Sequence, residues 1–260
     1  MHTVTDGIVF SQIKTLNGRR MIRLFSRDYG KISAGTSIRE SGKSKSALAL
    51  KPFVHGRYEL NKTHSTYHIN KAETLHSHYG LAGDMERYVN CSYVLELTDR
   101  LLPEGAPAEK LFLMLAEFLD LMEKRRKMFD PLVLSYIFKA LKLWGAAPEL
   151  EKCVACGNPA GSPAYFDIAG GGVICAECRA SAAEGSNIEK FENDKLLYPI
   201  NFGIVNVVKY LTDQPLRDFE RLALDEGVSA ALRLIARGYA AYHLDIGRLR
   251  TEEFFGVRDG

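Results

Sequence analysis

The chain has 260 residues, of which 46% are hydrophobic and 25% are charged, and its formal net charge is +2. This composition is typical of a globular protein with a sizeable core, built as one large domain or two to three small ones. No apolar run reaches the roughly 18 residues that a membrane-spanning helix needs. Met1–Gly7 also lacks the basic and apolar regions of a signal peptide. The sequence therefore excludes a spanning helix, and we expect no membrane partner. Because four of the five cysteines have metal-ligand spacing and Cys91 is left single, we expect a protein of the reducing cytoplasm.

The charges are divided unevenly along the chain. Residues 1–80 contain 13 Lys and Arg against 5 Asp and Glu, a net charge of +8, whereas residues 81–260 contain 21 against 27, a net charge of −6. Such asymmetry favours a basic module that binds a polyanion. We therefore expect two differently built units, residues 1–80 and residues 81–260, joined near Gly80–Gly83.

The first 75 residues are predicted to form short strands separated by turns. Asn17-Gly18 is a strong signal for a hairpin, and Ser37–Ser46 is expected to be a polar, basic loop. Five strands in so short a segment favour a small closed barrel of the OB or SH3-like type, because closure removes exposed strand edges. The expected strands are Gly7–Thr15, Arg20–Ser26, Lys31–Thr36, Phe53–Leu60 and Ser65–Glu73.

After Gly83 the hydrophobic pattern becomes helical. Three helices are expected before residue 145, and the third is almost entirely apolar, so it must be buried. Ala180–Asn187 is expected to be a linker, because its residues are small and polar. The expected helices are Asp84–Leu102, Pro107–Phe129, Leu132–Trp144 and a last one whose apolar stripe runs from Val228 to Leu249.

Four cysteines form the most specific motif of the chain. Cys153 and Cys156 make one Cys-x2-Cys pair, and Cys175 and Cys178 make a second pair eighteen residues later. Two such pairs are typical of a tetrahedral zinc site on a zinc ribbon, and Ala164–Val173 between them is long enough for a short hairpin. Four thiolates leave no open coordination position, so we expect a structural Zn²⁺. The predicted ribbon is inserted at about residues 150–180.

Other chemistry of these cysteines fits less well. A redox dithiol needs one Cys-x2-Cys near a βαβ unit, and here two pairs lie in a loop-rich segment. Cys175-Ala176-Glu177 resembles the ligand-x-Glu element of zinc deaminases, but that element precedes a Pro-Cys-x2-Cys, which is absent after it. The chain also has neither a GxxxxGK[ST] loop nor a Gly-x-Ser-x-Gly elbow. We therefore expect no catalytic residues.

A basic surface is expected on the barrel. Its loops and one sheet face can form a groove that follows a phosphate backbone, while aromatic side chains stack on bases. The candidate platforms are Phe25, Tyr29, Phe53, Tyr58 and Tyr67, at least half of which should lie in the core. The predicted nucleic-acid-binding residues are Arg19, Arg20, Lys31, Arg39, Lys43, Lys45, Lys51 and Arg57.

In this order along the chain, these features resemble those of the bacterial RecO family of recombination mediators. The ribbon contributes Cys153-Val154-Ala155-Cys156-Gly157 and the segment from Gly171 to Cys178. The remaining similar segments are Gly7–Phe10, Leu24–Lys31, Lys43–Lys45, Leu50–Phe53, His243-Leu244 and Arg250–Phe255.

The resemblance implies an α+β protein, in which an N-terminal five-stranded OB-type barrel precedes an α-helical domain that carries the four-cysteine zinc ribbon. It implies binding of single- and double-stranded DNA, annealing of strands coated by single-strand-binding protein, and help in loading RecA with RecR during gap repair. It also implies that the acidic tail of single-strand-binding protein binds the helical domain. The candidate tail contacts are Lys124, Arg125, Arg126 and Lys127, at a predicted helix end where they also complement the helix dipole.

Two other functions agree with parts of the sequence. An RNA-binding protein with an OB barrel and a zinc ribbon would share the basic barrel, and relative affinity for single-stranded DNA and RNA would distinguish it. A zinc-stabilised enzyme would lose catalysis but keep its fold when the metal is removed. A structural zinc would instead stabilise the helical domain.

Overall fold

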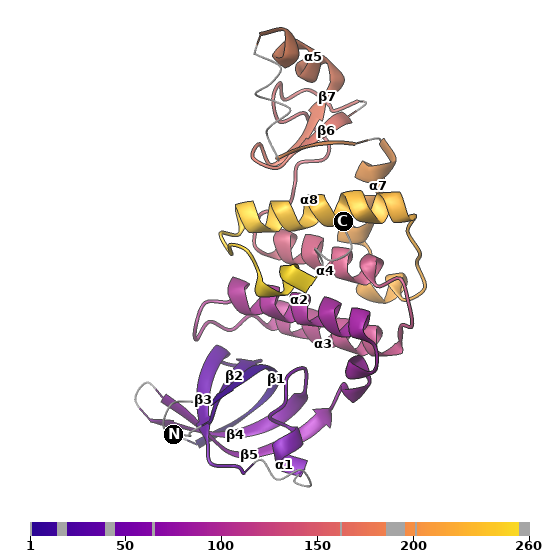
Figure 1. Cartoon of the computed structure of the whole chain (residues 1–260). Helices are drawn as coiled ribbons and strands as arrows, with labels where there is room; N and C mark the ends of the chain where they lie inside the picture. The colour runs from indigo at the N-terminus through magenta and orange to yellow at the C-terminus, as the bar shows by residue number, and fades with distance from the viewer. Residues whose placement is uncertain are drawn as a thin grey trace. The chain divides into compact units, whose positions relative to one another are not determined.

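The computed structural model describes residues 2–14, 20–39, 45–63, 66–161, 163–185, 196–200 and 202–254. It is an α+β chain with an N-terminal barrel followed by helices and a small second sheet (Figure 1). Contacts along the chain divide it into two compact units. Unit 1 comprises Met1–Lys127 together with Leu249–Gly260, and unit 2 comprises Met128–Arg248.

The barrel confirms the expected five strands and has the OB type of connectivity. The strand order is β1-β2-β3-β5-β4, and β4 closes the barrel by pairing with β1. All neighbouring pairs are antiparallel except β3 and β5, which are parallel over Ala34–Thr36. The strands are β1 His2–Lys14, β2 Arg20–Ser26, β3 Gly30–Thr36, β4 His55–Thr63 and β5 Thr66–His76.

The interior of the barrel is filled by alternate residues of its strands, as a period of two requires. Tyr58 is completely buried there and donates a hydrogen bond from its hydroxyl to the carbonyl of Ala49 at 2.6 Å. The short helix α1 (Lys45–Leu48) lies between β3 and β4, partly within the segment expected to be a loop. The core residues are Val9, Ile22, Leu24, Ile32, Ala34, Ala49, Leu50, Tyr58, Leu60, Ile69 and Ala72.

Two helices of unit 1, α2 (Met85–Leu101) and α3 (Glu109–Lys124), follow a 3-10 turn, η1 (Tyr79–Gly83). Asp84 caps α2 by accepting the backbone N–H of Arg87 at 2.8 Å. Phe112 of α3 packs edge-on against Phe25 of β2 at 5.3 Å between ring centroids. Gly30 begins β3 with a φ of +66°, and a Cβ there would collide with the carbonyl of Ala106, so only glycine allows this approach.

Unit 2 combines helices with the second sheet. Helix α4 (Asp130–Leu143) is buried as expected and packs against α7 (Phe202–Asp213) and α8 (Glu226–His243). Ser135 and Lys139 of α4 donate side-chain hydrogen bonds to the last turn of α7, each at 2.7 Å. The sheet has the order β7-β6-β8, from β6 (Pro163–Asp167), β7 (Gly172–Cys175) and β8 (Leu197–Pro199). The 3-10 helix η2 (Leu216–Phe219) also belongs to unit 2, whereas η3 (Arg250–Phe254) belongs to the second segment of unit 1.

The structure corrects three expectations about elements. The predicted linker at Ala180–Asn187 is helix α5 (Ala176–Gly185) as far as Gly185, because alanine is the best helix former whatever its size. Helix α3 ends at Lys124 rather than Phe129, since Arg125 takes an extended conformation. Helix α7 was not expected, although Ile204, Val205, Val208 and Leu211 carry the helical period. The predicted hairpin tip at Asn17-Gly18 lies outside the described residues.

Candidate metal centre and nucleic-acid interface

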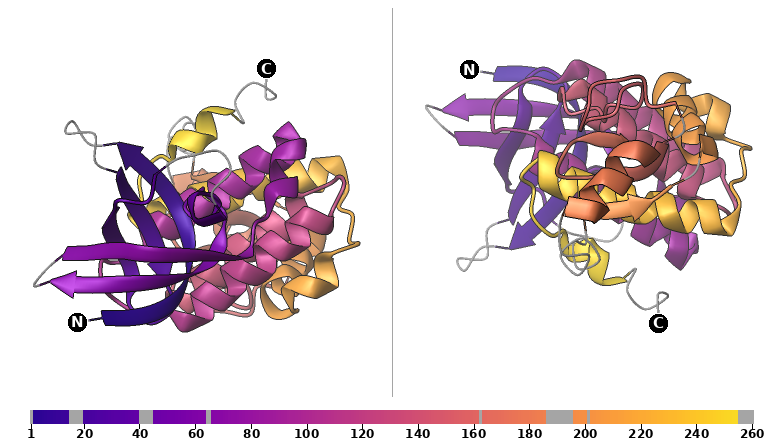
Figure 2. Two further views of the ribbon diagram at one scale, coloured as in Figure 1. Left: turned by 90° about the horizontal axis from the view of Figure 1, so that it is seen from below. Right: turned by 90° about the horizontal axis from the view of Figure 1, so that it is seen from above.

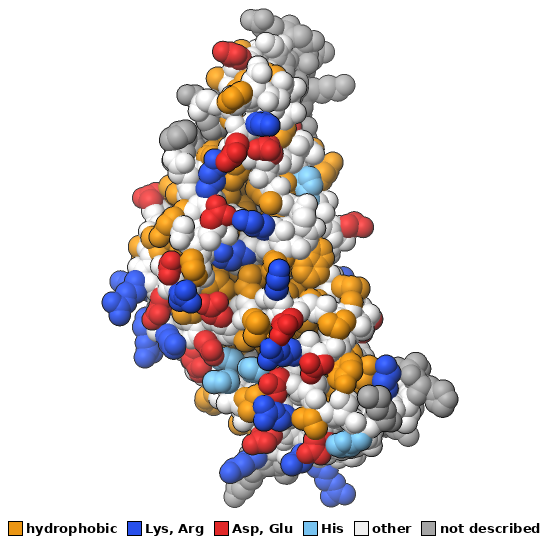
Figure 3. Space-filling model, turned by 180° about the vertical axis from the view of Figure 1, so that it is seen from behind, with side chains coloured by type: hydrophobic (Ala, Val, Ile, Leu, Met, Phe, Trp, Pro, Cys, Tyr) orange, Lys and Arg blue, Asp and Glu red, His pale blue; other side chains and the backbone are white. Residues whose placement is uncertain are grey.

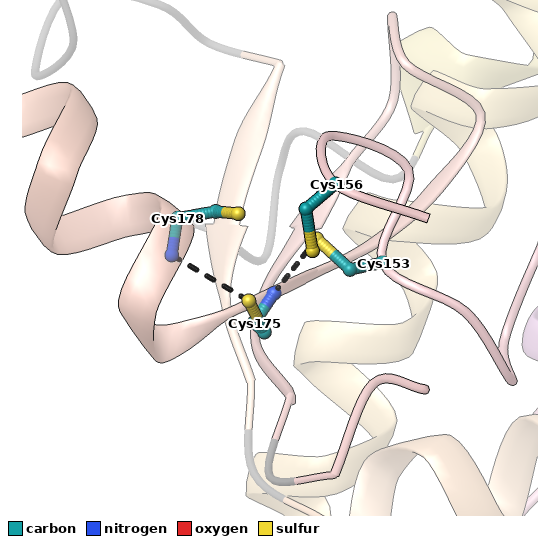
Figure 4. A group of neighbouring side chains, drawn as sticks. All are labelled: Cys153, Cys156, Cys175 and Cys178. Atoms are coloured by element: carbon teal, nitrogen blue, oxygen red, sulfur yellow. Dashed lines mark hydrogen bonds between the residues drawn. The ribbon is translucent and has the colours of Figure 1, made fainter. Parts of the chain in front are cut away.

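The four cysteines come together from three elements of unit 2 (Figure 4). Cys153 and Cys156 lie in the turn after α4, Cys175 ends β7, and Cys178 lies in the first turn of α5. Their sulfur atoms all lie within 4.8 Å of one another, so the group is able to hold a metal ion. It is the one such group of His, Cys, Asp or Glu side chains among the described residues. The expected cluster is therefore present.

Backbone hydrogen bonds shape the site around the sulfur atoms. The N–H of Cys175 donates to Sγ of Cys153 at 3.4 Å, and the N–H of Cys178 donates to Sγ of Cys175 at 3.5 Å. The first turn is closed by the N–H of Gly157, which donates to the carbonyl of Cys153 at 2.8 Å. Gly157 has a φ of +76°, a conformation that glycine adopts without strain.

The pKa values of Cys153 and Cys178 are shifted in opposite directions. Burial acts to raise the pKa of Cys153, but N–H donors from Cys175, Cys156 and Ala155 lower it to about 6. The pKa of Cys178 is raised to about 12, first by side-chain hydrogen bonds to Cys156 and Cys175. The thiols thus share protons instead of all ionising together. A divalent cation bound by four thiolates compensates for that repulsion, and this donor set fits zinc.

The ribbon is attached to the rest of unit 2 through the turn between β6 and β7. Nε2 of His243 lies 2.6 Å from the carbonyl oxygen of Ile168, and the hydroxyl of Tyr239 donates to the carbonyl of Gly171 at 3.1 Å. The two side chains stack on each other with ring centroids 4.1 Å apart. Both belong to α8, so the long C-terminal helix holds the backbone of the ribbon.

Two of the predicted nucleic-acid contacts lie in ion pairs of unit 1. Lys31 is buried, and its ammonium group lies 3.7 Å from Oδ1 of Asp99 and donates to the backbone carbonyl of the same residue at 2.7 Å. Nε of Arg57 donates to Oδ1 of Asp6 at 3.0 Å, and this pair borders a cavity of about 360 Å³ that Arg27 and Glu109 also line. On the face drawn in Figure 3, acidic and basic side chains likewise lie next to one another. Each such pair reduces the charge that is open to a polyanion.

Four other predicted contacts, Arg20, Arg39, Lys45 and Lys51, lie in the part of the chain that runs from β2 to β4. Arg20 begins β2 opposite Thr36, which ends β3, and Arg39 follows three residues later. Arg39, Lys45 and Lys51 are exposed, and neither Arg39 nor Lys45 makes an ion pair with a described residue. Arg20 is buried, and its Nη1 and Nη2 have no hydrogen-bond partner in the described part of the chain. Arg19 and Lys43 lie outside the described residues.

The basic run at the end of α3, residues 124–127, has three exposed side chains and one buried side chain. Lys124, Arg126 and Lys127 are exposed, whereas Arg125 is 7% exposed and its Nε donates to the carbonyl of Lys127 at 3.0 Å. Arg125 therefore supports the turn, and the three flanking charges remain open to a partner.

Sequence reasoning did not find Lys62, which lies with its ammonium group 5.2 Å from the ring centroid of Tyr67. The two residues pair across the β4–β5 hairpin, so their proximity depends on register. Counting the same number of residues away from the turn along each of the two strands would have identified Lys62 and Tyr67 as cross-strand neighbours.

Comparison with known proteins agrees with this architecture. Family models described as "Recombination protein O N terminal" and "Recombination protein O C terminal" match residues 1–78 and 82–253. "DNA repair protein RecO" of Pelotomaculum thermopropionicum is 29% identical over 92% of this chain and 88% of its own length. The proteins of the same name from Alkaliphilus metalliredigens and Symbiobacterium thermophilum are 26% and 28% identical, over 93% and 94% of their own lengths. None of the described helices has the length and apolar character needed to cross a membrane.

The two family models together cover almost the whole chain, and the similar curated proteins are named DNA repair proteins, so this chain belongs to the RecO family.

Proposed function

We propose that the chain is a recombination mediator without catalytic activity. It binds single- and double-stranded DNA, anneals complementary strands coated by single-strand-binding protein, and helps RecR to load RecA at gaps. The observation that carries this proposal is membership of the RecO family, with residues 1–80 as the DNA-binding module. Annealing needs no hydrolysis, only a basic surface that reduces the repulsion between two strands. The protein would act in the cytoplasm, at the nucleoid.

We propose that the DNA-binding residues of the barrel are Arg20, Arg39, Lys45 and Lys51, together with Arg19 and Lys43, which lie outside the described residues. Arg39 and Lys45 are the strongest members of this set, because they are exposed and have no ionic partner among the described residues. Lys31 and Arg57 would contribute only after giving up Asp99 and Asp6. The remaining sequence-based candidates therefore rank behind these two.

Two further parts of the proposal concern unit 2 and the basic turn. We propose that the four cysteines bind a structural Zn²⁺, for which a closed set of four sulfur donors is the usual arrangement. The exposed Lys124, Arg126 and Lys127 would attract the acidic tail of single-strand-binding protein. Replacing these three with Ala should weaken binding of a tail peptide in calorimetry, and unchanged binding would place the tail elsewhere.

Strand annealing tests the main proposal. Complementary oligonucleotides coated with single-strand-binding protein should anneal faster with the protein and without ATP, as followed by fluorescence energy transfer. For Arg39→Ala/Lys45→Ala, the slope of log affinity for single-stranded DNA against log salt should decrease by about 1.4, because two phosphate contacts are lost. Lys71→Ala/Lys142→Ala removes the same charge from ion-paired positions and should leave the slope unchanged.

The same titration separates the alternatives. If the slope is unchanged in Arg39→Ala/Lys45→Ala, these two residues do not contact the phosphates of the DNA. Tighter binding of RNA than of single-stranded DNA of the same sequence would favour the RNA-binding function.

A further inference from the structure

The barrel sorts its five candidate aromatic platforms into two groups. Phe25, Phe53 and Tyr58 are buried, with exposed fractions of 0%, 7% and 0%. Tyr29 and Tyr67 are partly exposed, and each packs one side against the barrel core. These two rings contact each other, with centroids 6.1 Å apart and planes inclined by 46°. The pair is therefore the aromatic surface that a ligand of the barrel can reach.

Both rings are held from several sides. The hydroxyl of Tyr29 lies 2.6 Å from Oγ1 of Thr3 on β1, and the backbone N–H of Tyr29 donates to Oγ of Ser26 at 3.1 Å. Tyr67, the second residue of β5, lies between Ala34 of the parallel strand β3 and Lys62 of the antiparallel strand β4. Figure 2 shows β4 and β5 running side by side to the edge of the barrel. The rings are thus positioned before any ligand binds.

The ammonium group of Lys62 occupies the face of the Tyr67 ring on which a ligand would stack. The ammonium group of exposed Lys62 lies 5.2 Å from the centroid of Tyr67, where it interacts with the π-system. A nucleobase is flat and also attracted to a ring face, and it arrives with a phosphate that attracts an ammonium group. A base can therefore replace Lys62 on the ring while Lys62 pairs with the adjoining phosphate.

We infer that Tyr29, Tyr67 and Lys62 form a stacking site for one unpaired nucleobase of a single strand. The inference rests on the proposed DNA binding. It adds a site for a base, at residues that are not among the basic residues proposed to contact phosphates. Bases in a duplex are already stacked and do not reach the site, so it distinguishes single-stranded from double-stranded nucleic acid. DNA and RNA share this chemistry.

Replacement of Tyr67 tests the site. Tyr67→Leu should weaken binding of single-stranded DNA by about 5- to 100-fold, the effect of losing one base–aromatic stack. Duplex affinity should change less than about twofold, and the salt dependence should stay the same, because no phosphate contact is removed. Tyr67→Phe keeps the ring and should bind as the wild type does. A 2-aminopurine base in the strand should be quenched by the wild type and by Tyr67→Phe only.

A second measurement uses the unaltered chain, in case Tyr67→Leu does not fold. A strand carrying 5-iodouracil should cross-link to Tyr67 or Tyr29 on irradiation, as located by mass spectrometry. Cross-links elsewhere only, or equal losses of single-strand and duplex affinity in a folded Tyr67→Leu variant, would overturn the stacking site.

A matched RNA strand identifies the source of the base. If the wild type binds RNA but no DNA, and Tyr67→Leu weakens the RNA binding, the proposed DNA function fails and the stacking site stands. If wild-type DNA binding is normal and Tyr67→Leu does not alter it, the stacking site alone fails. Binding of neither nucleic acid would remove both.

Discussion

Glu96 of α2 shows how one carboxylate fixes a distant part of the chain. Oε1 accepts the backbone N–H of Arg250 at 3.0 Å, and Oε2 accepts the N–H and the hydroxyl of Thr251 at 3.0 and 2.9 Å. Burial acts to raise the pKa of Glu96, but these hydrogen bonds outweigh it, and the pKa lies below its ordinary value. The ionised form is therefore the one that holds η3.

Replacing Glu96 by Gln should lower the free energy of unfolding by about 1 kcal/mol at pH 7, a value reduced for the partial exposure of the group. Because the folded pKa is depressed, the contribution is complete above the unfolded pKa of about 4.3 and is lost as the pH falls through the folded value. Urea unfolding at several pH values should show the two proteins converging in acid. Glu253→Gln on η3 is the control. A difference independent of pH would contradict the role of the charge.

Neighbouring side chains of opposite charge explain why accessible basic residues were harder to predict than the barrel. The sequence identifies Lys31 and Arg57 as basic, but not that Asp99 and Asp6 stand beside them, because those contacts depend on docking and strand register. The cysteines needed no such information, because their spacing alone brings four sulfur donors together. A local motif was thus predictable, whereas the availability of a surface charge was not.

At the scale of elements, the four-cysteine ribbon and α8 contact one another through the β6–β7 turn. Cys175 ends β7, the strand that follows this turn, so loss of its thiolate should loosen the hydrogen bonds of Tyr239 and His243 to the turn. The ribbon thereby connects the cysteine cluster to the packing of a long helix.

Cys175→Ser should therefore reduce the metal content and lower the thermal stability of unit 2 by several degrees, as expected when a structural zinc is weakened. Elemental analysis and calorimetry measure the two effects. Cys91→Ala alters the cysteine outside the cluster and should keep one metal ion per chain. Full metal content with unaltered unfolding in Cys175→Ser would refute the structural role.

The helices divide into those with clear end signals and those without. Asp84 and Pro103 bound α2 in the sequence, and the structure begins that helix at Met85 and ends it at Leu101. Helix α5 had no such signal, because its first turn is fixed by the two cysteines of the second pair. Helix α7 had a usable apolar period, so its omission was an error of interpretation rather than a lack of information.

At the scale of the molecule, the chain consists of two compact units, and residues 1–80, which are basic overall, all belong to unit 1. The basic barrel belongs to unit 1, and the cysteine cluster belongs to unit 2. Each has its own buried residues, so damage to one need not unfold the other.

We therefore expect Cys175→Ser, which weakens unit 2, to keep the affinity of the barrel for single-stranded DNA within about twofold at a temperature below its unfolding. Fluorescence anisotropy with a labelled oligonucleotide measures this, and Arg39→Ala/Lys45→Ala provides the converse: weakened binding with normal metal content. A large loss of DNA affinity in Cys175→Ser would show that the ribbon itself contacts the strand.

Unit 1 is discontinuous, and this sets an order for its completion during synthesis. The last residue of its first segment is Lys127, and its second segment begins at Leu249, after all of unit 2. At bacterial translation rates of about 5–20 residues per second, roughly 6 to 24 s separate the two on the ribosome. During that interval Arg250 and Thr251, the hydrogen-bond donors to Glu96, have not yet been synthesised. A nascent chain therefore completes unit 1 only after the four cysteines have been made, and a chain that terminates between Cys178 and Leu249 contains the cysteine cluster but lacks the segment that completes unit 1.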